Sequence, residues 1–578
     1  MTNFVRGLCV FVTIAAITVG LVWQPKEVVD TRSDNLWLAC LAVAAIALTT
    51  FFWYGWAKLK PNASPNARLR HNVQRVGTLM IVAFVLLSLQ LLREQIVQAD
   101  DIKKPFYTDS GDVVHDPRAD PFSVQRGNIR DSTGKIVVGI EVSPDGSVKR
   151  TYKDPNIAQI VGYYSPIQYG LSGLEKQYDD YLSGTTGANP ILKLQHDLLH
   201  EATPGNDLIL TIDPALQTAA INALGATNGS IVLLDANTGG VLAMVGNPHY
   251  DPSRLAYDPT LSGDARIKAT KAIGSYWQQL INDPNRPLVA PATQRVYTPG
   301  SIFKTITLGT ALDLGLTSLD TTWFDDGQFT IDFHRINDPN RPDTSKKTWT
   351  SQEGYMFSLN AVFAQMGLKI GADNFTNYTN KFGFGQNIPF DLPVSASTLY
   401  NPSDPNFLKT QTALTDTGFG QGQLQVTPLQ MALVAAAMGR NDGAMPKPFL
   451  VKEIRSAATV QSPQGLILQQ TKPDVWLRPL RQDTTKLMQT AMLASAKDGW
   501  VGRNGGGLPA TGATIGGKTG TAELGNGIEN AWYIAWASKG GRTFAIACVV
   551  DHKAGGEGLR DALPKANAVL QAALAGIK

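Results

Sequence analysis

The chain is 578 residues long and nearly neutral, with 51 lysines and arginines against 48 aspartates and glutamates. This length exceeds what one hydrophobic core supports, so we expect roughly two to four structural units. The charge balance lacks the basic domain or stripe that is typical of nucleic-acid-binding proteins. The three cysteines, Cys9, Cys40 and Cys548, supply neither a disulfide framework nor a Cys-x-x-Cys metal pair. The sequence therefore predicts no metal site, no cofactor and no nucleic-acid partner.

Three long apolar runs occupy the first hundred residues, at 5–23, 36–56 and 77–92. Each approaches the length of about 20 residues that a helix needs to cross a bilayer. The first run has no small-residue cleavage site before Gln24, which disfavours a removable signal peptide. We therefore predict a membrane anchor of three transmembrane helices over residues 1–95. The alternative, which concerns mainly the third run, is a buried core helix.

The connectors between these runs differ in charge. The connector 57–75 carries five basic residues and no acidic one, whereas the connector 24–35 mixes both signs. Basic loops tend to stay on the cytoplasmic side of a membrane. The pattern predicts that the N-terminus lies in the cytoplasm and that everything after the anchor lies outside.

A linker and a small module are predicted to follow the anchor. Residues 96–125 are polar and contain three prolines, which is typical of a linker. Within 126–142, apolar residues alternate around the turn residues 131–134, which predicts a hairpin. The apolar spacing over 170–184 predicts an amphipathic helix that ends at a glycine. We assign these elements to an α+β module over 126–205.

Residues 206–578 predict one large α+β domain. Two apolar strands flank a turn within 229–248, and three more strands are predicted within 514–551. The sequence between them is mostly helical and includes predicted helices at 301–316 and 427–440. Strands at both ends with helices between them imply one five-stranded antiparallel sheet.

A Ser-x-x-Lys spacing occurs twice in the chain. Ser132 and Lys135 belong to the predicted hairpin turn, where their side chains need not meet. Ser301 instead follows Pro299-Gly300 at the start of a predicted helix, where residues three apart share a face. The positive end of a helix and burial both lower a lysine pKa. Lys304 can therefore take the proton of the Ser301 hydroxyl, as in Ser-Lys nucleophilic catalysis.

Two further motifs follow Ser301 in chain order. Ser358-Leu359-Asn360 lies in a stretch that is expected to be helical, and Lys518-Thr519-Gly520-Thr521 lies on a predicted strand after a glycine pair. Ser-x-x-Lys, Ser-x-Asn and Lys-Thr-Gly in this order form a signature of proteins that react with penicillin. The chain resembles a class B penicillin-binding protein, a monofunctional peptidoglycan D,D-transpeptidase, over roughly residues 126–570. The resemblance extends to Arg126-Gly127-Asn128-Ile129-Arg130-Asp131, Gly173-Leu174-Glu175, Gly420-Gln421-Gly422 and Thr427-Pro428-Leu429-Gln430.

The resemblance implies a fold and a bacterial cell-membrane location. The fold is an α+β transpeptidase domain of the penicillin-binding and serine β-lactamase type, with a five-stranded antiparallel sheet flanked by helices and a helical subdomain. A small α+β dimerisation or pedestal module and the transmembrane helices precede it. The implied partners are stem peptides (a D-Ala-D-Ala donor and an amine acceptor), β-lactams as inhibitors, and a membrane peptidoglycan polymerase.

The resemblance also implies roles for the first two motifs. Ser301 attacks the penultimate D-Ala carbonyl of a stem peptide, and Lys304 is its general base. Ser358 relays a proton to the departing D-Ala, while Asn360 positions Lys304 and the substrate amide. The chain is then a serine-type acyltransferase that forms an acyl-enzyme with its substrate and with β-lactams.

The third motif is implied to bind substrate. Lys518, Thr519 and Thr521 shape the pocket and bind the terminal carboxylate. The backbone N–H groups of Ser301 and Thr521 form an oxyanion hole. Gly520 leaves room for substrate along the strand edge, where a side chain would collide.

Three other functions share parts of this signature. A class D-like β-lactamase usually has valine where Asn360 stands and lacks three anchors with a long N-terminal module. A membrane β-lactam sensor would need a cytoplasmic effector domain, and the predicted cytoplasmic loop is short. A non-catalytic scaffold of the cell-wall machinery would be expected to lose Ser301 or Lys304, and both are present.

Overall fold

The computed structural model describes residues 2–22, 31–53, 64–92, 106–107, 113–114, 125–144, 146–187, 204–458 and 462–577. The chain divides into two compact units, Met1–Ser123 and Val124–Lys578. Each unit is described by itself below.

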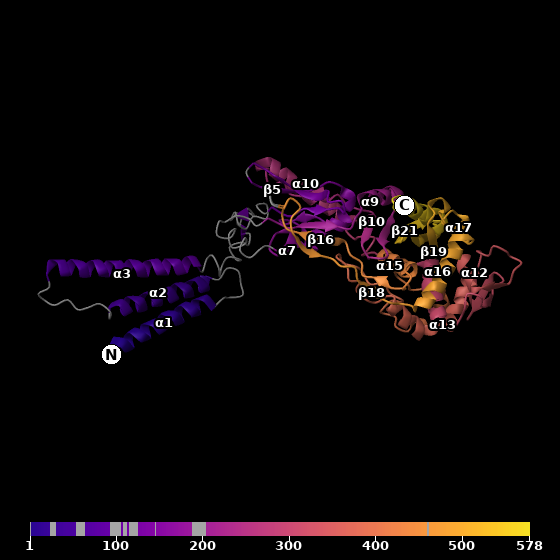
Figure 1. Cartoon of the computed structure of the whole chain (residues 1–578), viewed down its shortest axis with the longest axis horizontal. Helices are drawn as coiled ribbons and strands as arrows, with labels where there is room; N and C mark the ends of the chain where they lie inside the picture. The colour runs from indigo at the N-terminus through magenta and orange to yellow at the C-terminus, as the bar shows by residue number, and fades with distance from the viewer. Residues whose placement is uncertain are drawn as a thin grey trace. The chain divides into compact units, whose positions relative to one another are not determined.

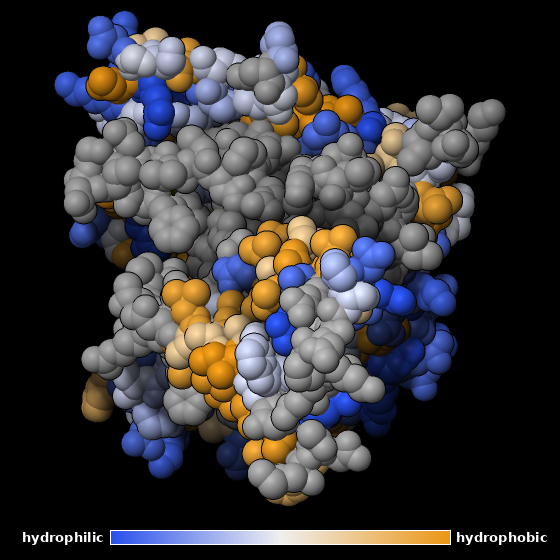
Figure 2. Space-filling view, turned by 90° about the vertical axis from the view of Figure 1, so that its left-hand side faces the viewer, coloured by the Kyte–Doolittle hydropathy of each residue, from blue (hydrophilic) through white to orange (hydrophobic). Residues whose placement is uncertain are grey.

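The first unit is dominated by three apolar helices, α1 (Thr2–Val22), α2 (Thr31–Trp53) and α3 (Pro65–Leu92) (Figure 1). The stretches Leu36–Trp53 and Pro65–Leu91 are long and apolar enough to cross a membrane, whereas the described apolar part of α1, Phe4–Val19, is shorter. The helices expose many large apolar side chains, and Figure 2 shows apolar surface in orange on the face that carries them. Exposed apolar surface of this extent suits a lipid environment better than water.

Little of the connecting sequence in this unit is described. The predicted linker 96–125 lies outside the described residues except for Gln125 and a two-stranded pair, β1 (Phe106–Tyr107) with β2 (Val113–Val114). The first part of the predicted basic connector, 57–63, also lies outside the described residues, whereas 65–75 belongs to helix α3.

A six-stranded sheet forms one end of the second unit, in the order β17-β16-β8-β3-β4-β5. The predicted hairpin is present, because β3 pairs antiparallel with β4 around the turn at 131–134. Three strands of this sheet follow the predicted boundary at 205/206, so the sheet joins the small module to the rest of the unit. The strands are β3 (Ile129–Arg130), β4 (Ile136–Val142), β5 (Val148–Tyr152), β8 (Asp207–Leu210), β16 (Val451–Arg455) and β17 (Ile467–Gln470).

The predicted helix over 170–184 is not continuous. Tyr178 has φ −116° and ψ 26°, which are not helical values, and it separates two short helices. The elements of this region are η2 (Pro155–Ile157), α5 (Ala158–Val161), β6 (Tyr164–Ser165), β7 (Gly170–Leu171), α6 (Gly173–Gln177) and α7 (Asp179–Leu182).

A buried ion cluster holds this module together. The Glu175 carboxylate accepts from Arg126 Nε at 2.7 Å and from Arg150 Nε at 2.6 Å, and it is fully buried. Arg126 also contacts Asp179 at 2.6 Å, and Arg150 donates to the carbonyl of Gly127. The cluster gives a physical reason for the Arg126-Gly127 and Gly173-Leu174-Glu175 sequences, since a buried charge must be paired and hydrogen-bonded.

The predicted five-stranded antiparallel sheet is confirmed, in the order β10-β9-β21-β20-β19 (Figure 1). Alternate residues of its central strands enter two different hydrophobic clusters, one on each face. Helix α15 (Pro428–Gly439) packs on one face, and α9 (Pro214–Leu224) with α18 (Leu563–Ala575) covers the other. The strands are β9 (Gly229–Asp235), β10 (Val241–Asn247), β19 (Thr514–Glu523), β20 (Ile528–Lys539) and β21 (Arg542–Ala554).

The covering helices start where the sequence supplies capping residues. Asp213 caps α9 and Thr427 caps α15, and a proline follows each as the first helical residue. The other helical segments are η3 (Pro252–Leu255), α10 (Gly263–Asn282), η4 (Gly300–Phe303), α11 (Lys304–Asp313), α12 (Ser351–Met356), α13 (Asn360–Lys381), η5 (Phe407–Lys409), α14 (Gln411–Phe419), α16 (Gln482–Lys497), α17 (Trp500–Arg503), η6 (Pro509–Thr511) and η7 (Gly558–Ala562). The small strand pairs are β11 (Thr322–Phe324) with β14 (Thr348–Thr350), β12 (Gln328–Ile331) with β13 (His334–Asn337), and β15 (Met445–Pro446) with β18 (Val475–Leu477).

Candidate active site

Ser301 lies in the 3-10 turn η4, directly before helix α11. The α-helix runs from Lys304 to Asp313, so it begins three residues later and ends three residues earlier than predicted. Gly300 has φ 58° and donates its N–H to the carbonyl of Gly420 at 2.8 Å. A Cβ on Gly300 would lie 2.5 Å from the carbonyl oxygen of Thr521. The glycine therefore lets the Ser301 turn press against strand β19.

Ser358 does not lie in a helix, contrary to the prediction. It connects α12 to α13 and has a left-handed φ of 60°. The chain must reverse here because Leu359, fully buried, bonds back to the carbonyl of Gly354 at 2.8 Å. The turn directs the Ser358 side chain towards two lysines, and Asn360 begins the next helix.

Lys304 is fully buried and makes three hydrogen bonds to the second motif. Its Nζ donates to Asn360 Oδ1 at 2.7 Å, to the carbonyl oxygen of Ser358 at 2.8 Å and to Ser358 Oγ at 3.3 Å. The Ser301 hydroxyl is not among the partners of Lys304, although the two residues are three apart in the chain. The structure thus ties the lysine of the first motif to the serine and asparagine of the second.

Lys518 approaches the same serine from strand β19. Its Nζ donates to Ser358 Oγ at 2.8 Å and to the carbonyl oxygen of Thr519 at 2.9 Å. The Ser358 hydroxyl therefore lies between the two lysine amines. Since a hydroxyl has one proton to donate and two lone pairs, it can pass a proton from one amine towards the other.

The two lysines have strongly altered acidity. Burial lowers the pKa of Lys304 to about 7, although the nearby carboxyl of Asp338 raises it in part. Burial lowers the pKa of Lys518 well below its ordinary value, and the charge on Lys304 lowers it further. A buried amine beside a second amine is favoured in its neutral form. Lys304 can therefore accept a proton near neutral pH.

A cleft of about 730 Å³ opens over these residues. Its lining includes all the predicted site residues except the two buried lysines: Ser301, Ser358, Asn360, Thr519, Gly520 and Thr521. The β12–β13 hairpin, α14 and Trp500 also contribute to its lining. The structure thus brings the three motifs, far apart in the sequence, to one cavity.

The structure gives Gly520 a different constraint from the predicted one. A Cβ at this position would lie 2.9 Å from Pro299 O and 2.9 Å from Ile302 N. The close packing of β19 on the Ser301 turn therefore requires a glycine here, independently of any space that the substrate needs.

Several cleft residues were not foreseen from the sequence. The hairpin contributes His334, Arg335, Ile336 and Asn337 to the cleft, and His334 Nε2 contacts Asp416 Oδ1 of α14 at 2.9 Å. The alternation in the sequence 328–337 was a usable strand signal. No signal in the sequence indicates that this hairpin faces Ser301, because that contact depends on the tertiary fold.

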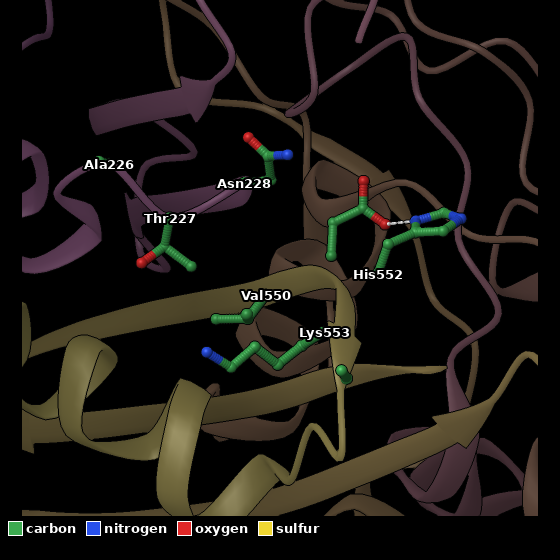
Figure 3. A pocket seen from close by; sticks show the side chains of 8 residues that line it. Ala226, Thr227, Asn228, Val550, His552 and Lys553 are labelled. Atoms are coloured by element: carbon green, nitrogen blue, oxygen red, sulfur yellow. Dashed lines mark hydrogen bonds and ion pairs between the residues drawn. The ribbon is translucent and has the colours of Figure 1, made fainter. Parts of the chain in front are cut away.

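A second hollow, of about 600 Å³, lies at the ends of β9 and β21 and holds none of the predicted residues. Asp551 and His552 are hydrogen-bonded to each other there, but Figure 3 shows the Lys553 side chain extending away from His552. The groups do not converge on one point, so this hollow does not compete as the active site. Within the described parts of the chain, no group of three or more His, Cys, Asp or Glu side chains could hold a metal ion.

Comparison with known proteins agrees with this geometry. The family pattern of the penicillin binding protein transpeptidase domain matches residues 229–574, and that of the penicillin binding protein A dimerisation domain matches residues 126–208. The chain belongs to the class B penicillin-binding proteins.

Three proteins illustrate the similarity of this penicillin-binding protein to others. It is 31% identical over 505 residues to the peptidoglycan D,D-transpeptidase PbpA of Mycolicibacterium smegmatis, covering 83% of this chain and 93% of the relative. It is similar in structure to penicillin-binding protein A of M. tuberculosis in a ceftriaxone acyl-enzyme complex, with a TM-score of 0.68 and 27% identity over 78% of this chain and 99% of the other. A D,D-transpeptidase domain from Eggerthella lenta matches with a TM-score of 0.64 and 28% identity, covering 78% of this chain and 98% of that domain.

Proposed function

We propose that this penicillin-binding protein is a membrane-anchored serine D,D-transpeptidase that cross-links peptidoglycan stem peptides and is acylated by β-lactams on Ser301. Its family membership and its relatives support a peptidoglycan transpeptidase. The observation that carries the site assignment is the Ser358 hydroxyl between Lys304 and Lys518, at the floor of the cleft that Ser301 lines.

In the first step the Ser301 oxygen attacks the penultimate D-Ala carbonyl of the donor stem peptide. The Ser301 proton passes to neutral Lys304, which Asn360 and Ser358 hold in place. The developing oxyanion accepts hydrogen bonds from the backbone N–H groups of Ser301 and Thr521, donors that are each worth about 3 kcal/mol in comparable sites.

Collapse of this intermediate breaks the D-Ala–D-Ala peptide bond. The leaving amine takes a proton from Lys304 through Ser358, while Lys518, Thr519 and Thr521 bind the terminal carboxylate. In the second half-reaction, an amine of another stem peptide attacks the acyl-enzyme. Its proton returns by the same route, and Ser301 is released with a new cross-link.

Labelled penicillin tests this assignment on the full chain in detergent. We expect a long-lived covalent adduct on the wild type, mapped by mass spectrometry to the peptide that contains Ser301, and no adduct on Ser301→Ala. Ser132→Ala is the matched control, because Ser132 has the same Ser-x-x-Lys spacing but lies in a hairpin turn. It should keep the adduct.

The same experiment separates the alternative functions. Rapid hydrolysis and release of the drug would favour a class D-like β-lactamase. A wild-type protein that forms no adduct would favour a scaffold of the cell-wall machinery. A stable adduct without cross-linking of stem peptides would favour a β-lactam sensor.

Anchoring and assembly belong to the same proposal. Residues 1–95 form the membrane anchor and 96–125 a linker, with the N-terminus in the cytoplasm; 126–205 form the pedestal module and 206–578 the transpeptidase domain outside the membrane. The apolar helices α2 and α3 support the anchor. A transpeptidase consumes newly polymerised strands, so the expected partner is a membrane peptidoglycan polymerase.

A further inference from the structure

Helix α13 receives its N-terminal cap from a distant segment. The N-cap residue, Leu359, has an apolar side chain and makes no side-chain cap bond. The N–H of Ala361 donates instead to Asp338 Oδ2 at 2.9 Å. A carboxylate is favoured here because the first turn of a helix has unpaired N–H groups and a positive dipole end. Asp338 thereby fixes the turn that begins at Asn360, the residue that binds Lys304.

Asp338 also belongs to the base of the hairpin that walls the cleft. It directly follows β13, and its N–H donates to the carbonyl of Gly327 at 2.9 Å. The N–H of Gly327 in turn donates to Asp325 Oδ1 at 2.8 Å. One buried residue thus contacts the hairpin through its backbone N–H and, through its carboxylate, the helix that orients Lys304.

Asp325 and Asp338 form a buried carboxyl pair. Asp325 is fully buried and Asp338 is 2% exposed. Among the residues that the structure describes, Asp325 Oδ2 and Asp338 Oδ1 have no donor. The two side chains are within hydrogen-bonding reach of each other, and burial raises the pKa of both. Two such carboxyl groups lose their protons one after the other, so over a range of pH one proton is shared between them.

The charged groups around this pair are few. Lys304 faces Asp338 from α11, with Lys518 of β19 beyond it. Arg341 and Asp326 face Asp325 from the same hairpin region. An ionised Asp338 would hold Lys304 as an ammonium ion, whereas a protonated Asp338 leaves Lys304 free to be an amine.

We propose that Asp338 is a positioning residue for the transpeptidase: it fixes Asn360 and Lys304 through the first turn of α13, and the proton that it shares with Asp325 keeps Lys304 uncharged. This inference rests on the proposed role of Lys304 as base. Asp325 favours the protonated form of Asp338, because its negative charge and its acceptor oxygen both oppose ionisation of the neighbour.

Replacing each carboxyl by an amide tests the two halves of the pair separately. The rate constant of acylation by a labelled penicillin is measured against pH for the full chain in detergent. Asp338→Asn keeps an oxygen for the Ala361 N–H and mimics the neutral, protonated form of Asp338, so the acid limb of the profile should stay close to that of the wild type. Asp325→Asn can donate to Asp338 and stabilise its carboxylate, so the acid limb should move to higher pH.

Two further variants complete the test. Asp332→Asn is the matched control, because Asp332 is exposed at the tip of the same hairpin and has a left-handed φ of 45° that asparagine tolerates; its profile should equal that of the wild type. Asp338→Ala loses the cap and should lower the plateau rate about tenfold or more, because the lysine is no longer held in place.

The outcomes distinguish this inference from the proposed function. An Asp325→Asn profile that coincides with the wild type, or an Asp338→Asn profile whose acid limb moves to lower pH, would overturn it. So would a wild-type plateau in Asp338→Ala. Asp325→Asn leaves the Asp338 cap in place and carries the test should the alanine variant fail to fold. If Ser301→Ala formed the same penicillin adduct as the wild type, in contrast, the proposed function itself would be overturned, and this inference with it.

Discussion

Ser358 has an unfavourable backbone conformation, and its hydroxyl accepts hydrogen bonds from both lysines of the site. A left-handed φ costs a non-glycine residue about 1–2 kcal/mol, and such conformations persist where the surrounding structure imposes them. Here α12 ends just before the turn and α13 begins just after it, and the Leu359 side chain is fully buried in the core. The conformation is what presents the hydroxyl to Lys304 and Lys518 together.

Two substitutions of Ser358 separate its chemistry from its strain. Ser358→Ala and Ser358→Gly both remove the hydroxyl, so each should reduce acylation by a labelled penicillin about 100-fold or more. Glycine adopts φ 60° without a Cβ penalty. Ser358→Gly should therefore melt at a higher temperature than Ser358→Ala. Equal melting temperatures would show that the turn is not strained, and retained acylation would exclude a proton relay at Ser358.

At the site, sequence reasoning found the residues that lie in motifs. Sequence reasoning singled out Ser301, Ser358 and Lys518 with their neighbours, which the structure brings together, while their catalytic and binding roles stay predictions. It failed at the Ser358 turn, because Met356-Phe357-Ser358-Leu359 holds no glycine or proline to mark a break. It also missed Asp338, since an aspartate before a proline reads as an exposed turn and its burial depends on contacts with α13.

At the element scale, the close packing of β19 on the 3-10 turn η4 fixes where Ser301 sits. Gly520→Ala would place a Cβ 2.9 Å from two backbone atoms, Pro299 O and Ile302 N, and neither can move without shifting Ser301. We expect at least a tenfold loss of acylation together with a lower melting temperature. Gly274→Ala in α10 is the control, because its Cβ would meet only Tyr169 Oη at 3.5 Å. An active, fully stable Gly520→Ala would contradict this account.

The ion cluster around Glu175 fixes the packing of the pedestal module, as the contact of β19 with η4 fixes the position of Ser301. Burial alone would raise the pKa of Glu175, but Arg150 and Arg126 lower it overall. Glu175→Gln leaves the buried guanidinium of Arg150 without a countercharge and leaves Arg126 with Asp179 alone, so it should cost about 3 kcal/mol in the free energy of unfolding. The exposed Glu141→Gln in the same module should change little.

The stability difference between the wild type and Glu175→Gln should depend on pH with a definite sign. A carboxyl whose pKa is lower in the folded than in the unfolded state stabilises the fold above its unfolded pKa, and this contribution is lost as pH falls through the folded pKa. The gap between wild type and Glu175→Gln in denaturant unfolding should therefore be largest near neutral pH and shrink in acid. A gap that stays constant or widens in acid would count against the ion cluster as its cause.

Elements with strong local patterns were the ones that the sequence predicted well. The five strands of the large sheet are long, apolar runs that are buried on both faces, and all five were found. The helix over 170–184 was predicted as one piece because its apolar spacing hides the break at Tyr178. Strands β16 and β17 join the module's sheet from 240 or more residues away along the chain, a pairing that no local pattern indicates.

At the scale of the whole molecule, the two units differ in what their surfaces suit. The helices of the first unit expose apolar side chains along their length, whereas the second unit buries nearly all of its large apolar residues in three clusters. The chemistry is also confined to the second unit, since every residue that lines the catalytic cleft follows residue 300. On the proposed function, the first unit would act by keeping the cleft on the outer side of the membrane, so its orientation is the property to test.

Single introduced cysteines test that orientation. The three native cysteines are buried, so they give little background with a membrane-impermeant maleimide. Ser64→Cys lies in the basic connector before α3, and Ser262→Cys lies on the exposed surface before α10. In intact spheroplasts we expect labelling at 262 and none at 64, because the basic connector stays in the cytoplasm. Permeabilised cells should label at both positions, which controls for accessibility of the thiol. Labelling at 64 in intact cells would place the connector outside, and α3 could then not cross the membrane if the cleft is to face the wall.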